Sequence, residues 1–269
     1  MTKITEQDSL YRHLEKMSVA ELTARINQED KKVALAIEQA LPQINAVIQK
    51  IVEQLQAGGR LFYLGAGSGG RLSVLDAIEL PTTYGVPKGM VNVILAGGVE
   101  YLIEAREEEE DDREAGWNAL QAQQVSTKDF VLGISASGTT PFVLESLKAC
   151  QANGIPTGCL VSNPQSPIAA HADLPIEVIT GPEFITGSTR MKCGTAQKMI
   201  FDMISTTTMV QLGRVEDNKM VNVLLINDKI TDRAVRMLME RSGITDYAEA
   251  KERLLSAGSV KKALDALDR

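Results

Sequence analysis

Residues 61–85 read LFYLGAGSGGRLSVLDAIELPTTYG, and this stretch decides the fold. It opens on an apolar run at residues 61–64 that is typical of a buried strand, and it continues in apolar residues at helical spacing. Between these two parts stand six small residues, GAGSGG. A strand, a glycine turn and a helix leave free backbone N–H groups at a helix N-terminus, where an anion is stabilised. The stretch therefore predicts an anion-binding turn, with Gly67, Ser68 and Gly69 as candidate binding residues.

A second turn of similar composition, GISASGTT at residues 133–140, follows another apolar run at residues 130–134. A serine in a single turn more often binds its own backbone, so neither turn alone would indicate a ligand. Two such turns at one edge of a sheet predict one phosphorylated ligand held between them. The candidate hydroxyl donors of the second turn are Ser135, Ser137, Thr139 and Thr140.

The glycines do not indicate a nucleotide. A dinucleotide site would want an acidic residue at the end of the second strand, where this chain has LAGG at residues 95–98. A Walker lysine does not follow the first glycines either. The two hydroxyl-rich turns favour a monophosphate.

The rest of the chain alternates strands with helices. Further apolar runs predict strands at residues 90–96, 156–161 and 175–179, and helical spacing predicts helices at 99–106, 141–151 and 189–212. Strands that are apolar throughout and alternate with helices are typical of parallel sheets covered on both faces. We expect an α/β fold with a five-stranded parallel sheet.

Helical segments flank this sheet. A capping box at Ser18 and Glu21 predicts a helix start, and a strong helical period follows over residues 30–56, which Pro42 should divide or kink. This arm either forms a dimerisation surface or covers its own sheet. Three short helices are expected at residues 231–241, 246–256 and 259–267. The predicted parts are a helical arm (1–57), a sheet domain (58–215) and a helical region (216–269).

Composition limits the function classes. A net charge of −7 argues against broad binding to nucleic acid or to an anionic membrane, and no apolar run has the length of a membrane span. The polar N-terminus does not read as a signal peptide, and three cysteines without a spaced framework fit a reducing compartment, so we expect a cytoplasmic protein. Only two histidines occur, so we expect neither a zinc site nor a histidine-based triad, although carboxylates could still bind Mg²⁺. We assign no metal-ligating residue and expect no cofactor.

Acid–base chemistry would then fall on carboxylates. Glu79 stands just before Pro81, which should stop the helix and hold the carboxylate at a rigid break. Six consecutive acids at residues 107–112 are usually a solvated helix end, but Glu110 or its neighbours could point to the sheet edge. Like charges packed there would raise some of their pKa values toward neutrality.

The segment GPEFITGSTRMK at residues 181–192 leads into the last long helix of the sheet region. Ser188 is suited to cap that helix, whereas Lys192 in its first turn opposes the helix dipole. A nearby anion or acidic residue would explain such a cation. Ser188 and Lys192 are therefore further candidate binding residues, although pairing with surface carboxylates is the simpler alternative.

Four segments together resemble the N-acetylmuramic acid 6-phosphate etherases of the sugar isomerase (SIS) domain superfamily, which also includes the glucokinase regulatory proteins. They are GAGSGGRLSVLDAIELPTTYG, the acids EEDD at residues 109–112, GISASGTTPFV and GPEFITGSTRMKCGTAQKMI. The resemblance extends over most of the chain. It implies a homodimer with a five-stranded parallel sheet and a small helical C-terminal piece.

The resemblance also implies an activity. The family cleaves the D-lactyl ether of its substrate to give N-acetylglucosamine 6-phosphate and D-lactate, without metal or cofactor. The implied route removes the C2 proton of the open-chain aldehyde, eliminates lactate from C3 and adds water. Two glutamates carry the acid–base steps, and they match Glu79 and Glu110. A phosphorylated amino sugar is the expected partner molecule.

This chain departs from the family pattern at four positions. Gly69 stands where the family has serine, Ile78 and Leu80 stand where it has serine and cysteine, and Thr139 stands where arginine is common. Two alternatives stay open: a non-catalytic sensor of a sugar phosphate, and an aldose–ketose isomerase. Because elimination needs both a base and an acid, retention of Glu79 and Glu110 favours catalysis over sensing.

Overall fold

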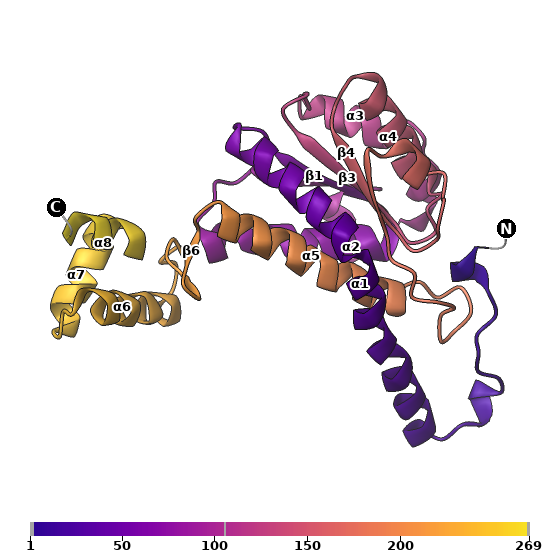
Figure 1. The fold of residues 1–269 in the computed structure, drawn as a ribbon, viewed down its shortest axis with the longest axis horizontal. Helices are drawn as coiled ribbons and strands as arrows, with labels where there is room; N and C mark the ends of the chain where they lie inside the picture. The colour runs from indigo at the N-terminus through magenta and orange to yellow at the C-terminus, as the bar shows by residue number, and fades with distance from the viewer. Residues whose placement is uncertain (1–2, 105, 268–269) are drawn as a thin grey trace. The chain divides into compact units, whose positions relative to one another are not determined.

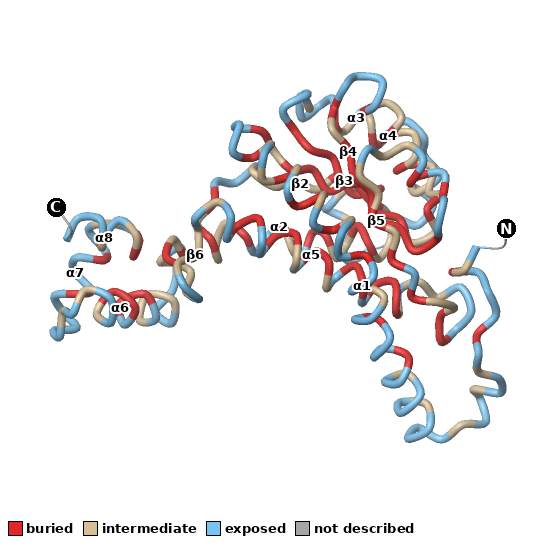
Figure 2. The backbone as a smooth tube through the Cα atoms, in the orientation of Figure 1, coloured by how far each residue is buried: buried red, intermediate tan, exposed pale blue. Residues whose placement is uncertain are grey.

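Five strands form the centre of a computed structural model that describes residues 3–104 and 106–267. The strands are β1 (Leu61–Gly65), β2 (Val91–Leu95), β3 (Phe130–Ser135), β4 (Thr157–Val161) and β5 (Leu174–Glu177). Every pair is parallel and the order is β2-β1-β3-β4-β5, which confirms the predicted α/β fold. Buried residues follow these strands (Figure 2).

The strand order reverses at the middle of the sheet. The chain goes from β1 outward to β2, and then returns to β3 on the other side of β1. The carboxyl ends of β1 and β3 therefore lie side by side, while the segments after them leave in different directions. Such a switch point is where open α/β sheets bind ligands. Both glycine turns of the sequence follow these two strands.

Helix α1 (Val19–Gln56) is a single element, so Pro42 does not divide it, and the alternative that Pro42 kinks it stays a prediction. Pro42 has no N–H to donate to the backbone carbonyl of Glu38, four residues earlier. Both residues are exposed, so water can solvate that carbonyl. The predicted capping box is confirmed, since the side chain of Ser18 accepts from the N–H of Glu21 and the Glu21 side chain accepts in return.

Helix α2 (Gly67–Tyr84) runs through Pro81, so the expectation that this proline stops the helix is wrong. The end comes at Gly85, whose φ of 62° suits glycine and whose N–H donates to the carbonyl of Pro81 at 3.0 Å. A proline costs one helical hydrogen bond, which the rest of the helix tolerates here. Glu79 therefore lies within a regular helix.

The segment after β2 differs from its prediction. Instead of a helix at 99–106, the structure has two short 3-10 helices, Val99–Tyr101 and Glu107–Asp111, with residue 105 outside the described range. Helix α3 (Ala115–Ala122), which the sequence did not indicate, follows them. The side chain of Asp112 accepts from the N–H groups of Glu114 and Ala115 at 2.9 Å and so satisfies donors before α3.

Two further helices complete the sheet region. They are α4 (Pro141–Ala152) and α5 (Lys192–Gln211). Helices α3 and α4 lie on one side of the sheet, and α1 and α5 lie on the other (Figure 1). Helix α5 begins three residues later than predicted, and its cap is not Ser188. The buried carboxylate of Glu183 accepts from the N–H groups of Lys192 and Cys193, both at 2.9 Å.

All three cysteines, Cys150, Cys159 and Cys193, are free and buried. Burial raises the pKa of each thiol to about 12. An ordinary thiol has a pKa of 9.0, so these raised values keep the three cysteines as neutral S–H groups at neutral pH.

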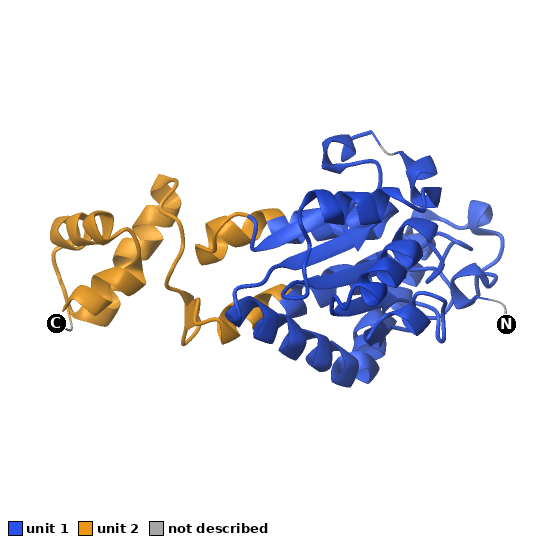
Figure 3. Ribbon diagram, turned by 90° about the horizontal axis from the view of Figure 1, so that it is seen from above, with its two compact units in different colours: residues 1–77, 89–204 blue, residues 78–88, 205–269 orange. Residues whose placement is uncertain are grey.

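The chain divides into two compact units, residues 1–77 with 89–204 and residues 78–88 with 205–269 (Figure 3). Residues before 58 belong to the same unit as the sheet, and the three-part division made from the sequence stays a prediction.

The second unit contains the three predicted C-terminal helices: α6 (Asp228–Ser242), α7 (Tyr247–Ala257) and α8 (Val260–Leu267). They share a core of their own that includes Leu238, Leu254 and Val260. A small hairpin of β6 (Val215–Glu216) and β7 (Lys219–Met220) precedes them and was not predicted. Among the described residues, no helix has the length and apolarity needed to cross a membrane.

Candidate functional site

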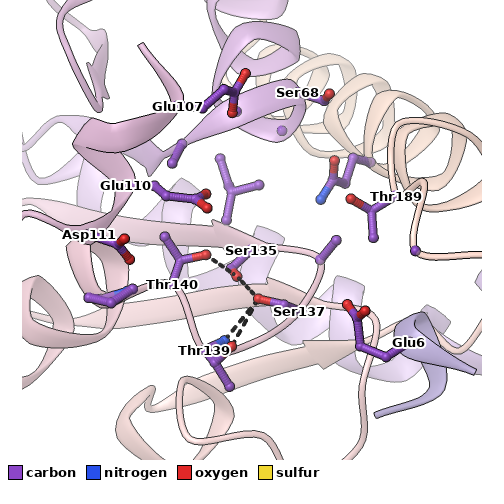
Figure 4. A pocket seen from close by; sticks show the side chains of 18 residues that line it. Glu6, Ser68, Glu107, Glu110, Asp111, Ser135, Ser137, Thr139, Thr140 and Thr189 are labelled. Atoms are coloured by element: carbon purple, nitrogen blue, oxygen red, sulfur yellow. Dashed lines mark hydrogen bonds between the residues drawn. The ribbon is translucent and has the colours of Figure 1, made fainter. Parts of the chain in front are cut away.

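A pocket of about 540 Å³ opens where the two glycine turns meet (Figure 4). All of its lining belongs to the first unit. Six segments supply it: the N-terminal 3-10 helix, the turn after β1, the acidic 3-10 helix, the turn after β3, the loop before α5 and helix α5 itself. The lining residues are Glu6, 66–69, Glu107, Glu110, Asp111, 134–137, 139–141, Gly187, Thr189 and Gln197.

The first turn presents backbone donors. Helix α2 begins at Gly67, whose φ is 54°, and its first internal bond runs from the N–H of Gly70 to the carbonyl of Ala66 at 3.1 Å. The N–H groups of residues 67–69 precede that bond, and no acceptor in the described chain takes them. They therefore remain available to an anion at the positive end of the helix dipole.

The second turn presents a chain of hydroxyls, drawn with dashed lines in Figure 4. The Oγ of Ser135 lies 2.8 Å from the Oγ1 of Thr140 and 3.2 Å from the Oγ of Ser137. The hydroxyl of Thr139 donates to Ser137 Oγ at 3.2 Å. Each hydroxyl can both donate and accept, so the chain can turn its hydrogens toward a bound phosphate.

Glu110 is a half-buried residue of the pocket lining. Burial raises the pKa of its carboxyl, and the neighbouring charges of Glu107 and Asp111 raise it further. The prediction that like charges would raise a pKa in the acid run is confirmed at this residue. Arg71 on α2 donates to Glu107 at 2.8 Å and ties the acidic segment to the first turn.

The binding residues predicted in the two turns, namely Gly67, Ser68, Gly69, Ser135, Ser137, Thr139 and Thr140, all line the pocket. Ser188 does not line it, although its neighbours Gly187 and Thr189 do. Lys192 is buried and also lies outside the lining, because its ammonium donates to Glu29 of α1 at 2.7 Å. An acidic residue therefore accounts for this cation, as the sequence argument allowed.

The two predicted catalytic glutamates belong to different compact units of the chain: Glu110 lies in the first unit and Glu79 in the second. Glu79 is exposed, and it is not one of the residues that line the pocket with Glu110.

Two lining residues, Glu6 and Gln197, escaped the sequence argument. Gln197 is buried beside the first turn, and a Cβ added to Gly69 would lie 2.8 Å from Ile134 Cγ2 and 3.0 Å from Gln197 Oε1. A serine at position 69 would therefore require Ile134 or Gln197 to move. The only local signal for Gln197 was its place in the GTAQKMI segment, and Glu6 had none.

The fold and this sheet-edge site define a SIS domain. The SIS domain family matches residues 114–207, and the family of the glucokinase regulatory protein N-terminal SIS domain matches residues 43–151. The fold is also that of a phosphoheptose isomerase from Francisella tularensis, with a TM-score of 0.54 at 15% identity, over 74% of this chain and 100% of that chain.

Within this class, sequence comparison identifies the family. The chain is 53% identical to an N-acetylmuramic acid 6-phosphate etherase of Bacteroides fragilis, over 98% of this chain and 94% of that protein. It is 52% identical to one of Bacteroides thetaiotaomicron, over 99% and 96% of the two chains. The chain belongs to the N-acetylmuramic acid 6-phosphate etherase family.

Proposed function

We propose that this protein cleaves the D-lactyl ether of N-acetylmuramic acid 6-phosphate to N-acetylglucosamine 6-phosphate and D-lactate. The observation that carries the proposal is the identity of 53% with an etherase over 98% of the chain. The pocket supports it, since it combines anion donors with a carboxyl whose pKa is raised. We further propose that the enzyme acts in the cytoplasm, where its three unpaired cysteines remain reduced.

The two turns would hold the phosphate. The N–H groups of residues 67–69 and the hydroxyls of Ser135, Ser137, Thr139 and Thr140 converge on the pocket and suit a phosphomonoester. The phosphate would then fix the sugar so that its C2–C3 bond lies beside Glu110. Such positioning lets remote binding contribute to the chemical step.

Glu110 would act as the base. A raised pKa makes its carboxylate more basic than an ordinary glutamate, which suits removal of the weakly acidic C2 proton next to the aldehyde. The C3–O bond then breaks, and Glu79 would donate a proton to the departing lactate oxygen. Water adds across the new double bond, with its hydroxyl on C3 and a proton on C2.

Glu79 could reach such a site from a second copy of the chain. Leu75 and Ile78 are 46% and 63% exposed, and they stand four and one residues before Glu79 on α2. An exposed apolar strip beside a catalytic carboxylate fits a surface that a partner subunit covers. We therefore propose a homodimer in which α2 of one chain completes the pocket of the other.

One assay tests the function. The purified chain is incubated with N-acetylmuramic acid 6-phosphate, and D-lactate is measured for the parent, Glu79→Gln and Glu110→Gln, with Glu108→Gln as an exposed control from the same acid run. We expect release by the parent and the control, and a loss of roughly 100-fold or more in both site variants. Binding without release by the parent would favour a sensor and contradict the proposal.

A further inference from the structure

Residues 3–9 lie against the pocket although they are distant from it in sequence. Glu6 is one of the lining residues, and Figure 4 shows its carboxylate entering from the N-terminal segment, away from Glu110. Lys3, Ile4 and Gln7 line a neighbouring cavity of about 800 Å³ that shares Ser137 and Thr139 with the pocket. The segment therefore separates two cavities that meet at the second turn.

The segment is held in place at both ends. The N–H of Thr5, a buried residue, donates to Asn163 Oδ1 at 3.2 Å, and Asn163 Nδ2 donates to Thr5 Oγ1 at 2.9 Å. The same amide group donates to the carbonyl of Ser137 at 3.0 Å. Farther along, the buried Ser9 donates from Oγ to the carbonyl of Phe184 at 2.7 Å. These bonds fix the segment relative to the second turn.

The first group that this segment supplies is a cation. The Nζ of Lys3 donates to Thr139 Oγ1 at 2.8 Å, and that hydroxyl donates to Ser137 Oγ at 3.2 Å. The described residues that line the pocket include no lysine and no arginine, but they include four carboxylates. Lys3 can therefore supply a counter-charge to a phosphate in the second turn through Thr139. A hydroxyl that accepts from an ammonium becomes a stronger donor.

The second group is an acceptor. An ionised carboxylate only accepts hydrogen bonds, so Glu6 can bind a sugar hydroxyl or the acetamido N–H, and it repels a phosphate. Lys3 immediately precedes the 3-10 helix Ile4–Glu6, and Glu6 is its last residue. Glu6 lines the pocket, and Lys3 donates to Thr139. Together they would favour one orientation of the bound ligand, with its phosphate at the second turn and its sugar toward Glu6.

We propose that the N-terminal segment is part of the substrate site, with Lys3 as counter-charge for the phosphate and Glu6 as acceptor for a donor group of the sugar. The identity of the ligand rests on the proposed function, whereas the two charge assignments hold for any sugar phosphate that binds here. Glu6 contacts the sugar, and Lys3 contacts Thr139 of the turn that binds the phosphate. Neither residue takes part in proton transfer.

Calorimetric titration of the full chain tests the assignments with two probes, inorganic phosphate and N-acetylglucosamine 6-phosphate. Lys3→Gln should weaken both by a similar factor, about threefold to tenfold. Glu6→Gln should weaken only the sugar phosphate, again by about threefold to tenfold. Inorganic phosphate should bind this variant at least as tightly as the parent, because a repelling carboxylate has been removed. Lys16→Gln and Glu15→Gln, two exposed charges of the same N-terminal region, serve as matched controls.

Equal affinities in Lys3→Gln and the parent, or equal losses for both probes in Glu6→Gln, would overturn the proposal. Because both side chains are exposed, the melting temperature should stay at the parent value. The same variants assayed for D-lactate release should show a raised KM with little change in kcat. If the parent releases no lactate but the titrations behave as expected, the proposed function fails and the N-terminal binding role stands.

Discussion

A carboxyl group takes its chemistry here from its surroundings more than from its place in an acid run. Burial and two like charges raise the pKa of Glu110, whereas backbone N–H groups of Ala115 and Glu114 lower the pKa of Asp112, only two residues away. Six consecutive acids therefore include a group suited to proton transfer and a group that caps the next helix. The distinction depends on which side chain faces the pocket.

Removing one of the like charges tests this account of Glu110. Glu107→Gln should lower the pKa of Glu110, and it also leaves the nearby Arg71 guanidinium without its partner, which acts in the same direction. A base must be ionised, so kcat/KM falls as the pH drops through its pKa. We expect the acid limb of the kcat/KM profile to move to lower pH in this variant.

Glu108→Gln is the matched control, since Glu108 is exposed and does not line the pocket. Its profile should coincide with that of the parent. A shift of the alkaline limb in place of the acid limb would show that Glu110 works as the acid, and no shift at all would remove it from proton transfer.

At the scale of elements, a buried charge network joins two helices. Glu29 of α1 and Lys192 at the start of α5 are each 2% exposed, and their charged atoms lie 2.7 Å apart. Tyr11 and Lys32 also donate to Glu29, at 2.9 and 2.6 Å. With Glu183 capping α5, this network holds the loop that carries Gly187 and Thr189 at the pocket.

Breaking this pair should be costly. Glu29→Gln leaves the ammonium of Lys192 buried without its counter-ion, and we expect a loss of about 3–5 kcal/mol in the free energy of unfolding. Adding Lys192→Met should recover most of that loss, because a methionine of similar length needs no partner. Urea unfolding measures both variants.

A matched control is Glu249→Gln on α7, which removes an exposed pair with Arg253 and should cost at most ~1 kcal/mol. Interactions with Lys192, Lys32 and Tyr11 overcome the burial of Glu29 and lower its pKa from 4.5 to about 2. Its contribution is therefore present above pH 4.5 and lost as the pH falls toward 2. A cost for Glu29→Gln as small as that of the control would contradict the role of the pair.

At the scale of the whole molecule, the proposed dimer predicts complementation. If Glu79 and Glu110 of one site come from different chains, Glu79→Gln and Glu110→Gln subunits can form mixed dimers with one complete site. After the two inactive variants are unfolded together and refolded, D-lactate release should return to about a quarter of the parent value, because half of the dimers are mixed and hold one intact site of two.

Each variant refolded alone is the control and should stay inactive. Failure of the mixture to recover activity, with dimers verified by analytical ultracentrifugation, would place both glutamates in one chain or show that one of them is dispensable.

Local patterns predicted most of the fold and half of the site. Five apolar runs gave the five strands, and the residues after β1 and β3 gave the pocket turns, because the carboxyl ends of parallel strands meet at one edge. Pro81 gave a false helix boundary, because α2 runs through it and ends at Gly85. Helix α1 likewise continues through Pro42, which is exposed. Long-range partners had no sequence signal: Lys192 binds Glu29, 163 residues away, and Glu6 reaches a pocket built by later segments.

The burial of the thiols has a practical consequence. Since Cys150, Cys159 and Cys193 are neutral and covered in the folded chain, maleimide reagents should leave the native protein unmodified. A cysteine introduced at an exposed position, for example in place of Glu252 on α7, would then be the sole attachment point for a fluorophore. Energy transfer between dyes could follow subunit exchange without any need to remove the native cysteines.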